Sequence, residues 1–209
     1  MILNTSNYQQ VSFWDKICQV FDWAEQNVTS TMFSCWAAHA ALYHHYGLKR
    51  HLREHKLFGV YRHRCLKPKE QLTRGFDECF SVPHSRYGYI DKADYQTLDN
   101  LEILAESADA GVYLVASKNK QQVYLTGHPE YDASTLSDEY FRDLDAGSKV
   151  SIPEHYFSDN NPTSDTANTW RSHGSLLFTN WLNYYVYQIT PYQLDADHMK
   201  AIHPGKSRG

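Results

Sequence analysis

Apolar residues recur with the period of an α-helix near the start of the chain. Trp14, Ile17, Phe21 and Ala24 are three or four positions apart, so one face of a helix would carry them all and cover a core. The preceding Ser12-Phe-Trp-Asp15 has the spacing of a capping box. We therefore expect a helix that opens at this motif.

The pattern changes between Thr29 and Gly47. Thr29 to Ser34 mixes β-branched, aromatic and small residues, which favours a short buried strand. Trp36 to Tyr46 is rich in alanine, contains no glycine or proline, and is followed by Gly47, a pattern typical of a helix and its C-terminal cap. Cys35 lies at the junction, so the sequence predicts a thiol on a sharp strand-to-helix turn.

Such a turn favours Cys35 as a nucleophile. It pushes the side chain out of the sheet, beside the backbone N–H groups of the helix N-terminus. These groups lower the pKa of a thiol and can stabilise a developing oxyanion. From this stretch alone, a buried cysteine before an ordinary helix is the alternative interpretation.

The middle of the chain has the pattern of short strands. Leu57 to Cys65 alternates loosely between apolar and polar residues, which indicates a strand. Ser81 to Tyr87 is predicted to be a loop, because Pro83 lacks the N–H that a central strand needs. Three further strands separated by turns indicate a meander; they cover residues 101–106, 112–117 and 122–126.

Two helices with a long loop between them complete the pattern. Ser134 to Ala146 has helical periodicity, and the polar residues 148–169 predict a surface loop. Trp170 to Thr190 is apolar nearly all round, which predicts a mostly buried helix, with a strand at its end as an alternative. Helices that alternate with strands indicate an α/β fold. We expect a single domain over residues 1–194 and a flexible tail over residues 195–209.

Composition excludes several classes of function. The chain has 209 residues, a formal net charge of −4 and four cysteines without a Cys-x-x-Cys pair. This charge gives no reason to expect a nucleic acid or an anionic membrane as partner. No apolar run is long enough for a membrane span, and the polar start does not have the pattern of a signal peptide. Unpaired cysteines favour free thiols and a cytoplasmic location.

A second group of reactive residues follows the last predicted strand of the meander. There the chain continues as Gly127-His-Pro-Glu130. In extended backbone, residues two apart point to the same side, so His128 and Glu130 can face one way. Glu130 could then orient the His128 imidazole as a general base. A surface turn is the alternative for these residues alone, but with Cys35 they suggest a Cys-His-Glu triad.

Several longer motifs resemble one protein family, the homoserine O-acyltransferases, which are also called homoserine transsuccinylases. The resemblance runs in order from about Val11 to Leu194. Its motifs are Val28-Thr-Ser-Thr-Met-Phe-Ser-Cys-Trp-Ala, Tyr43-His-His-Tyr-Gly, Lys56-Leu-Phe-Gly-Val-Tyr, Leu72-Thr-Arg-Gly-Phe-Asp, Pro83-His-Ser-Arg-Tyr, Leu101-Glu-Ile-Leu-Ala-Glu, Thr126-Gly-His-Pro-Glu-Tyr-Asp, Trp170-Arg-Ser-His-Gly and Leu177-Phe-Thr-Asn-Trp-Leu-Asn-Tyr-Tyr-Val-Tyr-Gln-Ile-Thr-Pro-Tyr.

The resemblance implies a fold and an activity. The expected fold is an α/β, class I glutamine-amidotransferase-like (flavodoxin-like) doubly wound sheet. The expected reaction, in methionine biosynthesis, transfers an acetyl or succinyl group from acyl-CoA to the hydroxyl of L-homoserine. Acetyl-CoA or succinyl-CoA would be a co-substrate, with no permanently bound cofactor and no metal. Whether the chain forms a homodimer is left open.

The resemblance also assigns roles to residues. By position, Cys35 would be the nucleophile that carries the acyl group as a thioester, His128 the general base and Glu130 its partner. Lys56, Ser85 and Arg142 match the substrate-binding positions of the family. Lysine and arginine would supply positive charge for the carboxylate of an amino acid.

The chain also departs from the family pattern. Family members have a longer N-terminal portion, with the first strands of the sheet and a Gly-Ala-Pro loop that supplies a second oxyanion donor. Met1-Ile-Leu-Asn-Thr-Ser does not reproduce that loop, and Ala37 and His39 replace the usual Gly and Gln. We therefore expect a chain that is N-terminally truncated relative to the family. Loss of one oxyanion donor typically slows an enzyme by about 100- to 1,000-fold.

Other functions remain open at this stage. A truncated, catalytically impaired remnant of such an enzyme is the main alternative. A Cys-His-Glu amidohydrolase or amidotransferase would use the same triad. His51-Leu-Arg-Glu-His55 also fits the His-x-x-Glu-His pattern of zinc proteases, although no third ligand is evident.

Overall fold

The computed structural model describes residue 5 and residues 7–191, so the predicted tail over residues 195–209 lies outside the described part. The first long helix, α1, covers Trp14–Asn27. Its apolar face is oriented as predicted, with Phe21 and Ala24 buried. The predicted capping box is wrong, because the residue before the helix is Phe13, which makes no side-chain capping bond.

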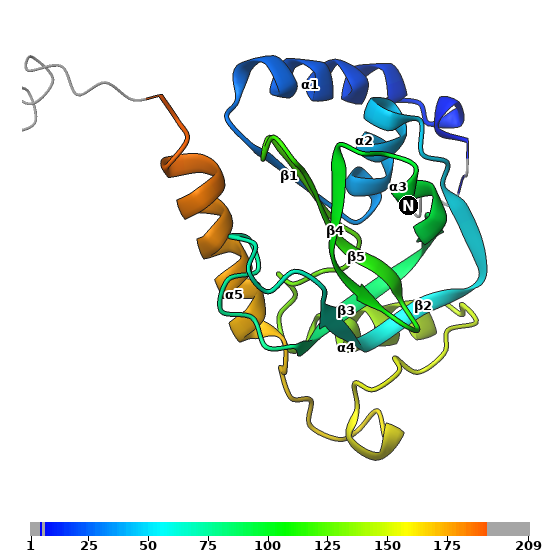
Figure 1. Cartoon of the computed structure of the whole chain (residues 1–209). Coiled ribbons are helices and arrows are strands. Elements are labelled where there is room, and N and C mark those ends of the chain that lie inside the picture. The colour runs from blue at the N-terminus through cyan, green and yellow to red at the C-terminus, as the bar shows by residue number, and fades with distance from the viewer. Residues whose placement is uncertain (1–4, 6, 192–209) are drawn as a thin grey trace, which may run out of the picture.

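Six strands form one mixed sheet (Figure 1). They are β1 (Thr31–Ser34), β2 (His51–Cys65), β3 (Cys79–Tyr89), β4 (Leu101–Ser107), β5 (Gly111–Ser117) and β6 (Gln122–Leu125). Their order is β1-β6-β5-β4-β2-β3. Only β1 and β6 pair in parallel, and the other pairs are antiparallel. The meander predicted for the last three strands is confirmed.

Helices cover both faces of this sheet, as the predicted α/β fold requires. Helix α2 (Trp36–Tyr46) packs with α1 on one face, around Phe33 and Tyr124. Helix α5 (Arg171–Asn180) and the π-helical segment η3 (Trp181–Tyr187) cover the other face, where Leu177 and Tyr185 are buried. In Figure 1, α1 and α2 lie on the opposite side of the strands from α5. This alternation of layers follows from strand residues that point alternately to the two faces.

The loop predicted around Pro83 is wrong, because these residues belong to β3. Among the described residues, β3 is the edge strand of the sheet and pairs only with β2, where Pro83 lies opposite Val60. A proline at an edge can turn its missing N–H away from the ladder, so it breaks no bond. On that outer side the Pro83 carbonyl accepts a hydrogen bond from the backbone N–H of His128, at 2.9 Å.

The zinc-protease interpretation of His51 and His55 is also wrong. Both residues lie in β2, not in a helix. Along an extended strand, residues four apart are separated by about 13 Å, too far to bind one metal ion.

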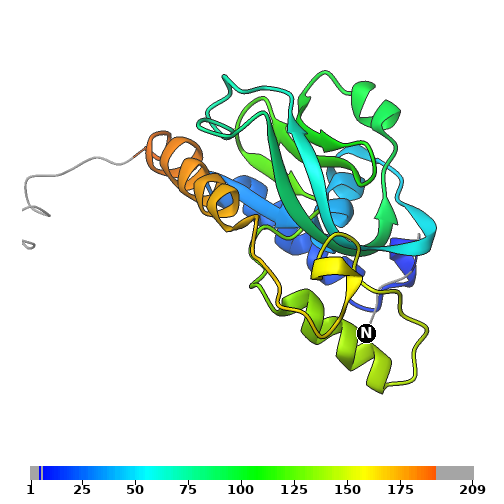
Figure 2. The same ribbon diagram turned by 90° about the horizontal axis from the view of Figure 1, so that it is seen from below.

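The remaining helices and the long loop lie outside the sheet. Helix α4 (Thr135–Asp145) packs its Leu136 and Tyr140 on Phe58 of β2, on the side of the molecule away from α1 (Figures 1 and 2). The loop over residues 148–169 is largely irregular, as predicted. Short helical elements are η1 (Tyr8–Gln10), α3 (Lys92–Gln96) and η2 (Ser158–Asn160).

The C-terminal helical segment differs from prediction in one respect. It is helical to Tyr187, so the alternative of a strand at its end is wrong. It is also less buried than predicted, because only one side packs on the sheet while Tyr187 is 75% exposed. Within the described residues, every helix is too short or too polar to cross a membrane.

Candidate active site

Cys35 occupies the turn between β1 and α2. Its backbone has φ 50° and ψ −114°, a conformation that residues other than glycine rarely adopt. Its N–H donates to the Leu125 carbonyl at 2.7 Å, which anchors the turn to the end of β6. The predicted strand-to-helix turn is therefore present, and α2 has the predicted bounds, with Gly47 as its left-handed cap.

His128 and Glu130 follow β6, the parallel neighbour of β1. Because the carboxyl ends of parallel strands meet at one edge of a sheet, this segment lies next to the Cys35 turn. The Cys35 thiol and the His128 imidazole are hydrogen-bonded. On its other side, His128 Nδ1 lies 2.7 Å from Glu130 Oε1. The structure thus brings together the three residues that the sequence singled out.

Close packing holds the His128 segment in place. The Tyr131 ring stacks on the His128 ring with centroids 4.2 Å apart. A Cβ on Gly127 would lie 2.8 Å from the buried His84 ring, and a Cβ on Gly174 of α5 would lie 2.6 Å from the Pro129 carbonyl oxygen. Both glycines permit contacts that any larger residue would disturb.

The charges of the site favour an ion pair between sulfur and imidazole. Burial raises the pKa of Cys35, but the hydrogen bond and charge of His128, with a further contribution from Arg86, lower the pKa below its ordinary value. Burial lowers the pKa of His128, but its bonds to Cys35 and Glu130 raise it to about 9. The pair therefore favours a thiolate, which is the nucleophilic form of cysteine.

A donor for a developing oxyanion lies beside the sulfur. The backbone N–H of Trp36 hydrogen-bonds the Cys35 sulfur and contributes to its lowered pKa. Trp36 is the first residue of α2, so this N–H has no partner inside the helix. When the sulfur bonds to a carbonyl carbon, the same N–H can stabilise the negative oxygen.

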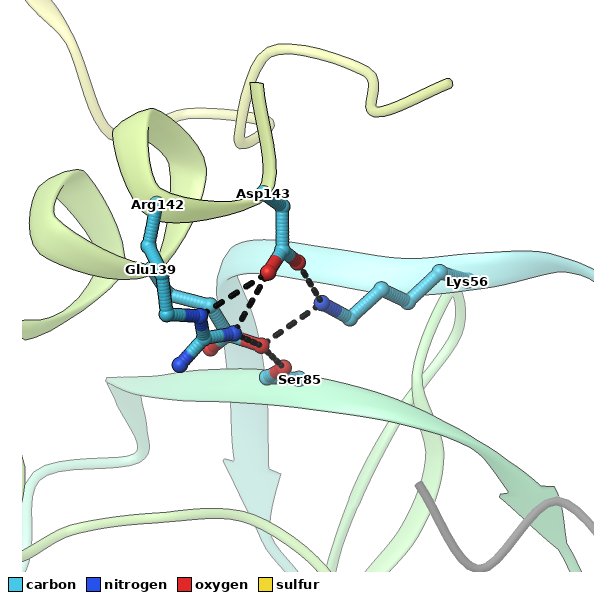
Figure 3. A network of polar contacts seen from close by, with 5 residues as sticks. All are labelled: Lys56, Ser85, Glu139, Arg142 and Asp143. Atoms are coloured by element: carbon cyan, nitrogen blue, oxygen red, sulfur yellow. Dashed lines mark hydrogen bonds and ion pairs between the residues drawn. The ribbon is translucent and has the colours of Figure 1, made fainter. Parts of the chain in front are cut away.

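A second polar cluster unites the three predicted substrate-binding residues (Figure 3). Lys56 Nζ lies 2.7 Å from Glu139 Oε1, and Ser85 Oγ donates to the same oxygen at 2.8 Å. Arg142 Nη2 lies 2.6 Å from Asp143 Oδ1. Lys56 comes from β2, Ser85 from β3 and the other three residues from α4. We call these five residues the acceptor cluster.

Sequence reasoning missed the two carboxylates of the acceptor cluster. A signal was available, because Glu139, Arg142 and Asp143 have the spacing i, i+3 and i+4 and must share one face of a helix. Tyr131, whose ring stacks on His128, is affected by charges of both sites. Burial, Glu139 and the Cys35 thiolate all raise the pKa of Tyr131.

Comparison with known proteins identifies the family of this chain. A family model described as homoserine O-succinyltransferase matches residues 2–192. The homoserine O-succinyltransferase of Alteromonas mediterranea is 52% identical over 188 residues, which cover 90% of this chain and 60% of that protein. The homoserine O-acetyltransferase of Clostridium acetobutylicum is 48% identical over 192 residues, or 92% of this chain and 64% of that protein.

The solved structures that match share the fold. A glutamine amidotransferase of Methylobacillus flagellatus has a TM-score of 0.61 and 9% identity, over 93% of this chain and 77% of that chain. One from Thermotoga maritima has a TM-score of 0.60 and 12% identity, over 87% and 73%. The class I glutamine-amidotransferase-like fold is therefore confirmed. The chain spans about 60% of the length of its curated relatives, and with the family match over residues 2–192 it belongs to the homoserine O-succinyltransferase family.

Proposed function

We propose that this chain transfers an acyl group from an acyl-CoA to the hydroxyl of L-homoserine, through a thioester on Cys35. The observation that carries the proposal is the position of His128 between the Cys35 sulfur and the Glu130 carboxylate. Because the chain spans about 60% of the length of its relatives, its activity is inferred from this site and from the family.

The first half-reaction uses the ion pair as it stands. The Cys35 thiolate attacks the thioester carbonyl, a bond from sulfur to carbon forms, and the negative oxygen accepts the N–H of Trp36. Collapse breaks the bond between the carbonyl carbon and the CoA sulfur. The His128 imidazolium gives its proton to the leaving CoA thiolate, so the products are free CoA and a Cys35 thioester.

The second half-reaction regenerates the enzyme. Neutral His128 takes the proton of the homoserine hydroxyl while the oxygen attacks the Cys35 thioester. The new ester bond forms as the bond from carbon to the Cys35 sulfur breaks, which restores thiolate and imidazolium. Glu130 stabilises the charged His128 and fixes its ring orientation in both steps.

The acceptor cluster has the charges that a zwitterionic amino acid needs. The guanidinium of Arg142, whose side chain is 66% exposed, is available to a carboxylate. Lys56 forms ion pairs with the carboxylates of Glu139 and Asp143. The ammonium of an amino acid is also positively charged, so it can bind the same carboxylates. The cluster contains two cations and two carboxylates. A zwitterion has no net charge, so its binding leaves the charges of the site balanced.

Product formation tests the proposal. The purified chain, incubated with L-homoserine and either acetyl-CoA or succinyl-CoA, should release O-acylhomoserine that mass spectrometry detects. Cys35→Ser should release none, and a variant of the half-buried Cys18 in α1, Cys18→Ser, should retain the activity. Absence of acylhomoserine from a folded chain that instead releases ammonia from glutamine would contradict acyl transfer and favour an amidotransferase.

A further inference from the structure

Two buried histidines on neighbouring strands take part in neither half-reaction described above. His63 of β2 is 1% exposed, and His84 of β3 has no exposed surface. Their rings lie nearly parallel, with 14° between the planes, and their Nε2 atoms are 3.2 Å apart. We call these two residues the histidine pair. Burial of a polar ring is unfavourable unless its nitrogens have hydrogen-bond partners, so the partners of the pair show what it does.

The outer partners of the pair fix which nitrogen of each ring carries the proton. His63 Nδ1 lies 2.9 Å from the Tyr61 carbonyl oxygen, which can only accept, so this nitrogen donates. Arg86 Nε lies 3.3 Å from His84 Nδ1 and can only donate, so that nitrogen accepts. The single proton between the two Nε2 atoms therefore belongs to His84. The hydrogen bonds run in one direction, from the Arg86 side chain to the Tyr61 backbone.

Both rings are neutral, as this direction requires. Burial lowers the pKa of His63 to about 3. Burial and the charge of Arg86 hold the pKa of His84 well below its usual range. The geometry leads to the same conclusion. A second proton on His63 would set two N–H groups against each other across 3.2 Å, and a second proton on His84 would face the Nε–H of Arg86.

Arg86 holds one end of this series of bonds in place. It is 6% exposed, and its terminal nitrogens donate to the Gly88 carbonyl and, at 2.6 Å, to the Ala110 carbonyl. Ala110 lies in the turn between β4 and β5, so the rigid guanidinium joins β3 to a distant turn. A bond at each nitrogen also prevents the His84 ring from turning over. One edge of this ring therefore keeps a fixed direction.

The fixed edge of the His84 ring faces the segment that carries the proposed base. A Cβ on Gly127 would lie 2.8 Å from His84 Cε1 and 2.9 Å from His84 Nε2, so the backbone before His128 packs on this edge. Pro83, the residue before His84, accepts the backbone N–H of His128 at 2.9 Å. Two successive residues of β3 thus hold two successive residues of the segment that follows β6.

We infer that the histidine pair, His63 and His84, positions the general base His128. The inference rests on the role proposed above for His128. Neither residue of the pair touches a reacting atom, and both act through the backbone of Gly127. Their effect should therefore appear in the ion pair of His128 with Cys35. A flat ring can approach a glycine closely while each of its nitrogens forms a bond, and an aliphatic side chain offers no such bonds.

The first measurement uses the unmodified chain. Nitrogen-15 NMR of the histidine side chains at neutral pH distinguishes protonated from unprotonated ring nitrogens. We expect His63 to carry its proton only on Nδ1 and His84 to carry its proton only on Nε2. The opposite assignment for either residue, or a doubly protonated ring in either, would overturn the inference.

The pH profile of Cys35 alkylation by iodoacetamide measures the effect on the base. His63→Phe keeps a ring beside Phe80 and Tyr113 but removes the acceptor of the His84 proton. We expect the midpoint of the profile to rise by about half a pH unit or more, which corresponds to about threefold slower alkylation below the midpoint. His63→Gln has a side-chain oxygen that can accept the same proton, so its midpoint should lie closer to that of the native chain.

Leu104→Ala controls for a general loss of stability. Leu104 of β4 is fully buried, so removal of its side chain lowers the melting temperature. It forms none of the bonds of the histidine pair. The midpoint of Cys35 alkylation should therefore stay unchanged in this variant, at a temperature where it is folded.

The outcomes separate this inference from the proposed function, because iodoacetamide requires no acyl-CoA site. An unchanged midpoint in folded His63→Phe, or an equal rise in His63→Gln, would overturn the inference and leave acyl transfer through Cys35 unaffected. A native chain that yields no acylhomoserine, while His63→Phe shows the expected rise, would overturn the proposed function and leave the positioning of His128 in place.

Discussion

The pKa values of two histidines of this chain, His63 and His128, shift in opposite directions because their neighbours differ. Burial lowers the pKa of His63 to about 3, and its bond to the Tyr61 carbonyl offsets this only in part. His128 is half-buried, yet its pKa rises to about 9 because a thiol and a carboxylate face its two nitrogens. Burial alone would raise the pKa of Cys35 and make it a poor nucleophile. The neighbouring charges are therefore what lowers the pKa of its thiol.

Removal of His128 should therefore shift the titration of Cys35 upward. With its pKa lowered, the thiol of the native chain remains a thiolate at pH values below the ordinary range of a cysteine. In His128→Gln, burial is no longer opposed by an imidazolium, so the pKa should rise. Alkylation of Cys35 by iodoacetamide at pH 7 should slow at least about tenfold.

Cys18 supplies an internal control for this measurement. Its pKa is raised by burial and by Asp22 and Asp15, and no histidine contributes. Peptide mapping should show the same alkylation rate at Cys18 in both proteins. An unchanged pH midpoint for Cys35 in His128→Gln would contradict the ion pair.

The sequence alone was enough to identify some residues of the site, but not others. Cys35 and His128 were identifiable because each follows a predicted strand, so local pattern places them. Arg86 was not identifiable as buried, because its segment was predicted to be a loop. Its burial depends on contacts with Gly88 and Ala110, and the contact with Ala110 joins segments 24 residues apart.

At the scale of elements, α5 packs against the segment that contains His128 and Glu130, on the opposite face of the sheet from α1 and α2. Gly174 lets this helix approach the Pro129 carbonyl so closely that a Cβ would lie 2.6 Å from its oxygen. Pro129 sits between His128 and Glu130, so the position of the helix limits the position of both side chains. The close contact therefore explains why a glycine stands at the end of the Trp170-Arg-Ser-His-Gly motif.

Gly174→Ala should lower activity although the residue lies inside a helix. Glycine to alanine in a helix ordinarily stabilises by roughly 0.5–1 kcal/mol. Here the added methyl collides with backbone, so we expect a lower melting temperature and at least a tenfold lower acylation rate at Cys35. The neighbouring Ser175→Ala, on the exposed side of α5, should change neither; a more stable and fully active Gly174→Ala would refute the contact.

Elements with local stop signals were predictable, and those fixed by distant partners were not. Helix α2 ends where Gly47 adopts a left-handed conformation, so both of its bounds followed from the sequence. β3 was missed because a proline is compatible with a strand only at an edge. Edge position depends on the order of strands in the whole sheet, which no local pattern contains.

At the scale of the whole molecule, the two halves of the proposed reaction rest on different elements. The turns that follow β1 and β6 hold the nucleophile and base, whereas β2, β3 and α4 hold the acceptor cluster. The ring of Tyr131 stacks on His128. This division predicts that formation of the acyl-enzyme and its discharge by homoserine can be separated by mutation.

Arg142→Ala provides that separation. We expect Cys35 to acquire its acyl group at the normal rate in this variant, and homoserine to discharge the acyl group about tenfold more slowly than in the native chain. Arg171→Ala removes another exposed arginine, at the start of α5, and should leave both rates unchanged.

The most direct measurement is a chase followed by intact-protein mass spectrometry. The native chain is mixed with succinyl-CoA alone, freed of excess donor, and then given L-homoserine. We predict one added succinyl group, mapped to Cys35 and absent from Cys35→Ser, which homoserine removes as O-succinylhomoserine. Acylation at Cys18, Cys65 or Cys79 instead, or a Cys35 thioester that homoserine does not discharge, would contradict the proposed transfer.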